Sequence, residues 1–188
     1  MNQKQSTPPD QPTYWNEEGG RRWVENIQRV ECMIEPLSAQ LLRHAAPRAG
    51  EQVLDVGCGG GVTSAAYATE VGPSGQVLGL DVSAVILAVA RERYAAIANL
   101  SFALGDAATM PLDAESFDLV SSRFGVMFFA DPVAAFTNLR VALRPTGRLA
   151  FICWRALDEN PELPSCTRRR FSDLGPGGPQ PLAAPAPD

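Results

Sequence analysis

The stretch Val53-Leu-Asp-Val-Gly-Cys-Gly-Gly-Gly61 runs from an apolar segment into a turn dominated by glycine. The apolar residues predict a short buried strand over Gln52–Val56, and the sequence after the turn predicts a helix over Val62–Val71. Glycine is needed where the backbone takes a positive φ or passes close to a ligand. A helix that begins directly behind such a turn also presents unpaired N–H groups. The stretch therefore predicts a ligand-binding turn between a strand and a helix.

The sequence that follows continues this alternation of strands and helices. Further strands are expected at Gln76–Asp81, Leu100–Leu104, Phe117–Ser122 and Arg148–Cys153. Ser83 suits the N-cap of a helix that runs to about Ala98. Asp131 and Pro132 suit the N-cap and first position of another helix, which stops before Pro145. The alternation predicts an α/β fold whose mainly parallel sheet is covered on both faces.

The sequence before the turn predicts a long helix and a flexible arm. Apolar residues recur at steps of three and four between about Glu17 and Ala46, at Trp23, Ile27, Val30, Ile34, Leu37, Leu41 and Leu42. This spacing places them on one stripe of a helix, with a break or kink expected near Pro36. Residues 1–13 are polar and carry three prolines, and we expect a flexible arm there.

The composition restricts the class of protein. A chain of 188 residues is the size of one domain, and its net charge of −5 opposes binding to nucleic-acid phosphates or anionic membranes. The start has no secretory signal, and no apolar stretch is long enough to span a bilayer. Four scattered cysteines and a single histidine lack the spacing of a zinc site. We therefore expect a cytoplasmic protein with reduced thiols and no metal.

The residues around the turn indicate the kind of cofactor. Gly57, Gly59 and Gly61 are followed by Val62, where a dinucleotide fingerprint would have a further glycine or alanine. Asp55 directly precedes the turn, where its carboxylate would repel a pyrophosphate. The same carboxylate suits a cofactor with a cationic end, such as S-adenosylmethionine (SAM), which carries an ammonium and a sulfonium.

Two more acidic residues follow the next strands. Asp81 ends the second strand, where a carboxylate can accept both hydroxyls of a ribose. Asp106 follows the third strand, where it could accept a hydrogen bond from the adenine amine. Because the carboxyl ends of parallel strands share one edge of the sheet, we expect both to lie beside Asp55.

These segments together resemble the class I SAM-dependent methyltransferases, with a methyltransferase type 11/25-like domain over residues 14–155. The resemblance rests on Val53–Gly61, Leu78–Ser83, Gly105–Ala107, Ser116–Val120 and Leu143–Leu149. It is nearest to the small-molecule enzymes similar to ubiquinone and menaquinone C-methyltransferases. Such a fold is a Rossmann-like three-layer αβα sandwich with strand order 3-2-1-4-5 and an N-terminal helical lid.

The resemblance implies a cofactor site and a substrate side. The cofactor contacts would come from Asp55, Gly57, Cys58, Gly59, Gly61, Asp81, Val82, Asp106, Ala107 and Arg123. Asp55 would hold the methionine ammonium, and Val82 would pack on the adenine. Trp15 and Phe124 would face the substrate. Tyr14, Trp15 and Trp23 could also cap the cofactor by attracting its sulfonium, or could simply anchor the first helix.

The C-terminal segment departs from the family. Seven prolines fall between Pro161 and Pro187, and a central strand does not tolerate them. We expect residues 156–188 to be a disordered tail, with the C-terminal β-hairpin of the full fold missing and the chain truncated. The predicted function is methyl transfer from SAM to a small molecule. The alternatives are a truncated SAM-binding module without catalysis and, third, a nicotinamide-dependent oxidoreductase. His44, near the end of the first helix, is expected to be structural.

Overall fold

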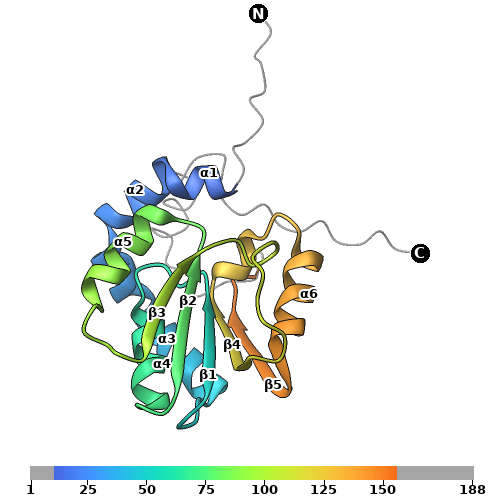
Figure 1. Cartoon of the computed structure of the whole chain (residues 1–188). Coiled ribbons are helices and arrows are strands. Elements are labelled where there is room, and N and C mark those ends of the chain that lie inside the picture. The colour runs from blue at the N-terminus through green and yellow to red at the C-terminus, as the bar shows by residue number, and fades with distance from the viewer. Residues whose placement is uncertain (1–10, 156–188) are drawn as a thin grey trace, which may run out of the picture.

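The computed structural model describes residues 11–155, which form a five-stranded parallel sheet (Figure 1). The strands are β1 (Gln52–Val56), β2 (Gln76–Asp81), β3 (Leu100–Leu104), β4 (Phe117–Arg123) and β5 (Leu143–Ile152). Their order is β3-β2-β1-β4-β5, and every neighbouring pair is parallel. This confirms the predicted α/β fold and its strand order. Residues 156–188, with the predicted tail and the missing hairpin, lie outside the described residues.

Helices cover both faces of this sheet. They are α1 (Gln11–Asn16), α2 (Glu18–Glu25), α3 (Ile27–Ala45), α4 (Val62–Val71), α5 (Ala84–Arg93) and α6 (Pro132–Ala142), with a 3-10 turn η1 at Gly125–Phe128. Val53 packs with Ala45 of α3 and Tyr67 of α4, whereas the next residue, Leu54, packs in a second core with Leu139 of α6. Successive strand residues thus supply opposite faces, as a sheet buried on both sides requires.

The N-terminal helices differ from the prediction in where they begin and break. The break lies at Asn26, between α2 and α3, and α3 continues through Pro36. Pro36 is exposed, so the carbonyl that loses its partner there can face water. The stripe on either side of it is buried, which holds the helix together across the proline. Helix α1 begins at Gln11, so the last three residues of the predicted arm are helical.

Two other boundaries were predicted wrongly. Helix α5 ends at Arg93 and not near Ala98, because the chain turns there to bring Asn99 beside β2, where its carbonyl accepts from Val77 N at 2.8 Å. Strand β5 starts at Leu143 and includes Pro145. The pairing with β4 skips residues 144–147, so this proline sits in a bulge where no ladder hydrogen bond is lost. The N-caps at Ser83 and Asp131 are confirmed by their bonds to Ile86 N and Ala134 N.

The small helices α1 and α2 lie at the end of the molecule where α5 begins, at the top of Figure 1. Asn16 fixes α1 there, because its Nδ2 donates to Val82 O at 2.7 Å and its Oδ1 accepts from Ala84 N at 2.8 Å. The Ser83 hydroxyl adds a bond to Trp15 O at 2.6 Å. The N-terminal helices are thus held over the carboxyl edge of the sheet. Within residues 11–155, no helix is long and apolar enough to cross a membrane.

Candidate functional site

The glycine turn between β1 and α4 has the backbone that its sequence predicted. Gly57, Gly59 and Gly61 all take positive φ, at 66°, 55° and 83°. At Gly57 the space is restricted as well, since a Cβ there would lie 2.6 Å from the Cα of Gly125. The backbone of the turn therefore passes directly against the segment that follows β4. No residue with a side chain fits at Gly57 without moving one of the two loops.

Asp55 lies at the end of β1, immediately behind this turn, and is fully buried. Its Oδ2 accepts hydrogen bonds from Thr63 Oγ1 at 2.7 Å and from Ser64 Oγ at 2.6 Å. Its Oδ1 is buried and has no partner among the described residues. Burial raises the pKa of this carboxyl, while the two hydroxyls and the charge of Arg123 act in the opposite direction. The site thus holds a buried acceptor that still lacks a donor.

Arg123 ends β4 and is buried on the same side of the sheet. Its Nη1 donates to Ser38 Oγ of α3 at 2.6 Å. Burial lowers the pKa of the guanidinium, and the negative charges of Asp55 and Glu31 counter this effect. The predicted cofactor residue Arg123 therefore also anchors α3 to the sheet.

Asp81 ends β2 and connects the strand to the glycine turn. Its Oδ2 accepts from Gly59 N at 2.8 Å, and its Oδ1 accepts from Ser83 N at 2.9 Å. Burial raises its pKa, which these backbone N–H groups partly offset. Each carboxylate oxygen can accept more than one hydrogen bond, so both retain capacity for a hydroxyl donor.

The residues after β3 offer fewer side-chain groups to a ligand. Asp106 is half-buried, and its Oδ1 accepts from Ala108 N at 2.8 Å. Ala107 is buried in the core against Leu54 and Leu80, and its carbonyl accepts from Asn138 Nδ2 at 2.8 Å. A ligand contact at position 107 would therefore come from the backbone. The same holds for Cys58, whose buried thiol has a pKa raised well above its ordinary value by burial.

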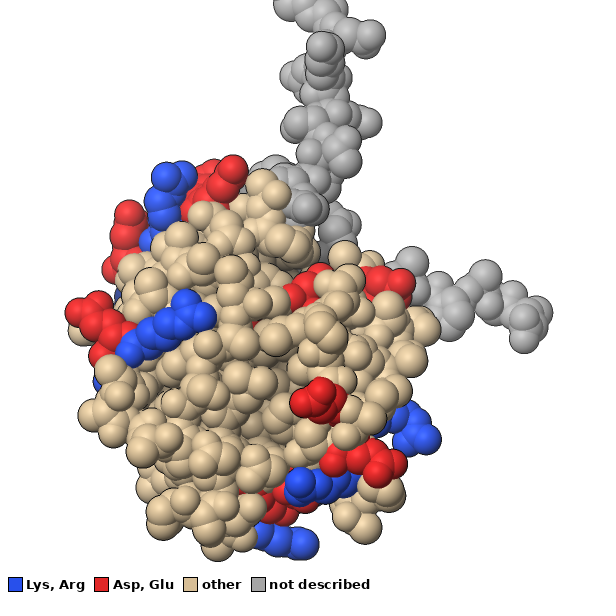
Figure 2. Space-filling view, viewed as in Figure 1, with Lys and Arg blue, Asp and Glu red and all other residues tan. Residues whose placement is uncertain are grey.

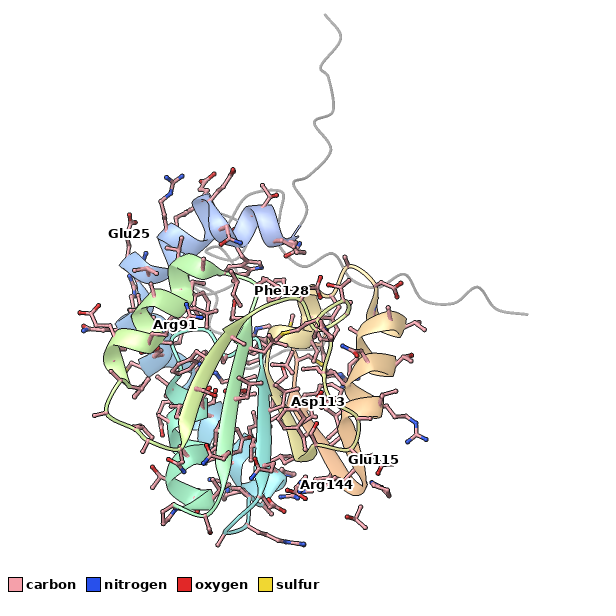
Figure 3. All side chains as sticks on the ribbon, viewed as in Figure 1. Glu25, Arg91, Asp113, Glu115, Phe128 and Arg144 are labelled. Atoms are coloured by element: carbon pink, nitrogen blue, oxygen red, sulfur yellow. The ribbon has the colours of Figure 1, made fainter. Side chains whose placement is uncertain are left out.

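Aromatic side chains from distant segments meet at this edge. Trp15 packs edge-to-face on Phe128, with ring centroids 5.1 Å apart, and on Trp23 at 6.0 Å. Phe124, which has an unusual φ of 67°, stacks on Trp154 at 4.6 Å. Figure 3 shows Phe128 near the upper end of the sheet. The two predicted substrate residues thus lie in two separate aromatic contacts, Trp15 with Phe128 and Trp23, and Phe124 with Trp154.

Charged pairs occupy the opposite end of the sheet. Arg144 donates to Glu115 O at 3.2 Å and to the carboxylate of Asp118, and Figure 3 shows Arg144 and Glu115 at the lower end. His44 is exposed in the last turn of α3, where Nδ1 lies 3.1 Å from Gln40 O. His44 is therefore far along α3 from the glycine turn, which fits the structural role expected of it.

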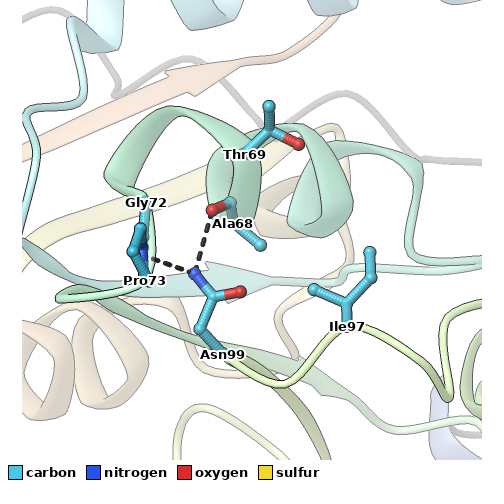
Figure 4. Close-up of a pocket in the computed structure, with 6 residues that line it drawn as sticks. All are labelled: Ala68, Thr69, Gly72, Pro73, Ile97 and Asn99. Carbon is cyan, nitrogen blue, oxygen red and sulfur yellow. Dashed lines mark hydrogen bonds between the residues drawn. The ribbon is translucent and has the colours of Figure 1, made fainter.

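A groove of about 340 Å³ lies beside the C-terminus of α4, lined by Ala68, Thr69, Gly72, Pro73, Ile97 and Asn99 (Figure 4). Asn99 Nδ2 donates to Ala68 O at 2.9 Å and to Gly72 O at 2.8 Å, which satisfies carbonyls at the end of the helix. The glycine turn lies at the other end of α4. The groove is thus formed around the end of a helix, and it shares no residue with the candidate site.

The sequence analysis missed the residues that hydrogen-bond to the predicted site residues or hold the neighbouring helix in place. Thr63 and Ser64 bind Asp55, Ser38 binds Arg123, and Asn16 secures α1. The hydroxyls at 63 and 64 could have been noticed as polar residues in the first turn of an otherwise apolar helix. Ser38 and Asn16 carry no such signal, because their partners are 85 and 66 residues away in the chain.

Comparisons with known proteins agree with this geometry. A family model described as a methyltransferase domain matches residues 47–172, which runs past the predicted boundary at 155 and omits the N-terminal helices. The demethylmenaquinone methyltransferase of Staphylococcus aureus is 34% identical over 108 residues, covering 57% of this chain and 45% of that protein. The chain spans less than half the length of the curated relatives compared with it.

Solved structures show the same fold. Phosphoethanolamine N-methyltransferase 2 of Haemonchus contortus, in complex with SAM, is 31% identical with a TM-score of 0.58, covering 62% of this chain and 27% of that one. A SAM-dependent methyltransferase of Aquifex aeolicus is 24% identical with a TM-score of 0.59, covering 63% and 64%. At that identity the second structure supports the fold alone.

Proposed function

Because this chain belongs to the methyltransferase domain family of class I SAM-dependent enzymes, we propose that it binds SAM and transfers a methyl group to a small-molecule acceptor. The observation that carries the proposal is the unpaired Oδ1 of Asp55, buried directly behind the glycine turn. A buried charged acceptor without a donor is costly, and a ligand ammonium would satisfy it. The methionine end of SAM carries such an ammonium.

The remaining predicted residues fit the rest of the cofactor. Asp81 can accept the two ribose hydroxyls, because each of its oxygens can accept a further hydrogen bond beside those from the backbone. We propose that Val82 and Asp106 contact the adenine and that the methionine chain lies along the backbone from Gly57 to Gly61. Asp55 and Asp81 lie at the ends of β1 and β2 and Asp106 follows β3, so the three would hold a single extended ligand along one edge of neighbouring strands.

The chain's contribution to the chemistry is alignment. When bound, SAM supplies an electrophilic methyl group on a positively charged sulfur, which leaves as the neutral thioether. Transfer to a nucleophilic O, N or C requires an in-line approach, and fixing that geometry can supply several kcal/mol of the barrier, about 7–11 in favourable cases. Asp55 and Asp81 fix the cofactor, while Phe124 and Trp15 would exclude water and orient the acceptor. No dedicated acid or base is needed for a good nucleophile.

The net charge and the aromatic side chains near the turn support a small organic acceptor rather than a nucleic acid. The net charge is −5, and Figure 2 shows acidic and basic side chains mixed around an uncharged central area on the face in view. The acceptor side carries aromatic rings at Trp15, Phe124 and Phe128. We propose an acceptor with an apolar body. The free thiols at Cys32, Cys58 and Cys153 fit a reducing compartment such as the cytoplasm.

Calorimetric titration of the purified chain with SAM, together with the variant Asp81→Ala, tests the cofactor site. We expect the variant to bind at least about tenfold more weakly, because it loses hydrogen bonds to a charged group. Asp118→Ala is the matched control, since Asp118 lies at the amino end of β4, away from the turn. Equal binding by wild type and Asp81→Ala would show that the ribose assignment is wrong.

The same preparation separates the rival functions. Binding of SAM with no turnover on a panel of small acceptors would select a SAM-binding module without catalysis. Tight binding of NADH with no binding of SAM would overturn the proposal in favour of an oxidoreductase. We do not expect that outcome, because Asp55 would repel a pyrophosphate and Val62 replaces the glycine of the dinucleotide fingerprint.

A further inference from the structure

Two buried polar atoms lack a hydrogen-bond partner in the part of the chain that the structure describes. One is Oδ1 of Asp55, and the other is Nε1 of Trp23 on helix α2. The first can only accept when ionised, and the second can only donate. Both adjoin the same glycine turn, because Asp55 precedes it and a Cβ on Gly59 would lie 3.9 Å from Trp23 Nε1. An unpaired acceptor and an unpaired donor thus both adjoin the glycine turn.

The packing around Trp23 does not explain its unpaired N–H. A buried indole N–H usually finds a partner, and the neighbouring Trp15 has one, since its Nε1 donates to Gln11 Oε1 at 3.1 Å. Trp15 and Trp23 meet edge-to-face at 6.0 Å, which gives the two rings apolar contact. Two indoles in one cluster therefore differ, and only the one beside the glycine turn is unsatisfied.

Helix α3, which follows α2 after Asn26, packs against the glycine turn. A Cβ on Gly60 would lie 2.5 Å from Ile27 Cδ1 and 2.6 Å from Glu31 Oε1, so α3 packs directly on the turn. Glu31 is also held by Arg93 of α5, whose Nη1 donates to its two oxygens at 2.9 and 3.0 Å. Trp23 thus lies four residues before a residue, Ile27, that contacts the turn directly.

We propose that Trp23 donates its indole N–H to the carboxylate at the amino-acid end of the cofactor, whose ammonium is bound by Asp55. An α-amino acid carries both charges on one carbon, so the two unpaired atoms of this site match its two ends. This inference rests on the proposed function, because it takes SAM as the ligand. It adds a residue outside the region matched by the family model, and it gives α2 a direct role in binding.

The variants Trp23→Phe and Trp15→Phe test this role. The probes are S-adenosylhomocysteine and 5′-methylthioadenosine, which has the same adenosine and thioether but no amino acid. We expect Trp23→Phe to weaken S-adenosylhomocysteine about ten- to a hundredfold, as for the loss of a hydrogen bond to a charged group, with 5′-methylthioadenosine unchanged within about twofold. Trp15→Phe should change both affinities by the same factor.

Each other outcome has a distinct meaning. If Trp23→Phe weakens both probes equally, or neither, Trp23 is a packing residue and the inference is wrong. If the wild-type chain binds neither probe, the proposed function itself fails. If Trp23→Phe does not fold, the indole N–H signals of the ¹⁵N-labelled wild-type chain decide. One of the three must move downfield with S-adenosylhomocysteine and stay in place with 5′-methylthioadenosine, and its failure to do so refutes the role.

Discussion

Replacing Asp55 with asparagine is expected to move stability and cofactor affinity in opposite directions. Asp55 is fully buried, and its two hydroxyl donors both serve Oδ2. Asparagine keeps the shape and an oxygen that can accept from Thr63 and Ser64. Its neutral amide NH2 then takes the place of the oxygen that has no partner in the described structure, so an unpaired charged acceptor becomes an unpaired neutral donor. The free protein therefore loses the energetic cost of a buried unpaired charge, and the bound complex loses the ionic contact with the ligand ammonium.

The sizes of the two effects follow from the burial and the hydrogen bonds. Leaving a neutral polar group unpaired costs about 1–3 kcal/mol and an ionised one more, so Asp55→Asn should stabilise the free protein by about 1 kcal/mol or more at neutral pH. A hydrogen bond to a charged group contributes about 1.5–3 kcal/mol, so affinity for S-adenosylhomocysteine should fall at least about tenfold.

The pH dependence gives the direction of the stability effect a second test. Burial raises the pKa of Asp55 in the folded state, so the folded protein holds that proton to a higher pH than the unfolded chain. The stability from this group is fully present below the ordinary aspartate value near pH 4, and is lost as pH rises through the folded-state pKa. The advantage of Asp55→Asn should therefore be small in acid and grow toward neutral pH.

Asp118→Asn provides a control of the opposite sign. Burial alone would raise the pKa of Asp118, but Gln52 N and Arg144 donate to its carboxylate and hold the pKa below its ordinary value. Its contribution is present above that value and lost as pH falls through the folded-state pKa. Urea unfolding followed by tryptophan fluorescence from about pH 2 to 8, a range that extends to both sides of the ordinary aspartate pKa, measures both variants. An Asp55→Asn protein less stable than wild type at neutral pH would refute the account of Asp55.

Further tests address the turn and the sheet edge. Gly57→Ala should cost about 3 kcal/mol, from about 1–2 for a left-handed backbone and the rest from the clash with Gly125. Gly50→Ala, also at positive φ but with no Cβ contact closer than 3.5 Å, should cost only the backbone contribution. Equal urea midpoints for the two variants would show that the clash at Gly57 does not contribute. Arg148→Leu should cost about 2 kcal/mol, because Arg148 bonds two carbonyls at the end of α3 and the Glu51 carboxylate. The Arg148 hydrogen bond lowers the Glu51 pKa, so the stability lost in Arg148→Leu should shrink as pH falls below the ordinary glutamate value. A stability loss that stays the same in thermal unfolding at low pH would contradict this assignment.

Features set by local sequence were predicted with their correct residues. Val62–Val71 and Gln76–Asp81 have the bounds that were expected, and Ser83 and Asp131 cap their helices as predicted. A strand, a glycine turn and an N-cap depend on neighbours within a few residues, so their signals lie together in the chain. The three acidic residues also follow from this, since Asp55 and Asp81 lie within the last two residues of β1 and β2 and Asp106 lies two residues after β3.

Features set by packing were not predictable from local signals. A proline usually breaks a helix, but at Pro36 the buried stripe on both sides outweighs the lost hydrogen bond, while the break occurs at Asn26. Strand β5 includes Pro145 because the register with β4 shifts there. The unpaired state of Trp23 is of the same kind, because it depends on how α2 and α3 settle on the turn.

In the proposed cofactor site, this difference in origin separates the residues on the sheet from Trp23 on the N-terminal helices. Asp55 and Asp81 stand on the sheet and are held by bonds within the strand ends and the turn. Trp23 reaches the same turn only if α3 stays docked, through the Glu31–Arg93 pair and the Arg123 bond to Ser38. If a ligand contacts both parts, its binding energy favours the docked helices, and docked helices in turn favour the ligand. On this proposal the N-terminal helices add to the affinity for the amino-acid end of the ligand, which Asp55 also binds, while Asp81 contributes to the affinity for its nucleoside.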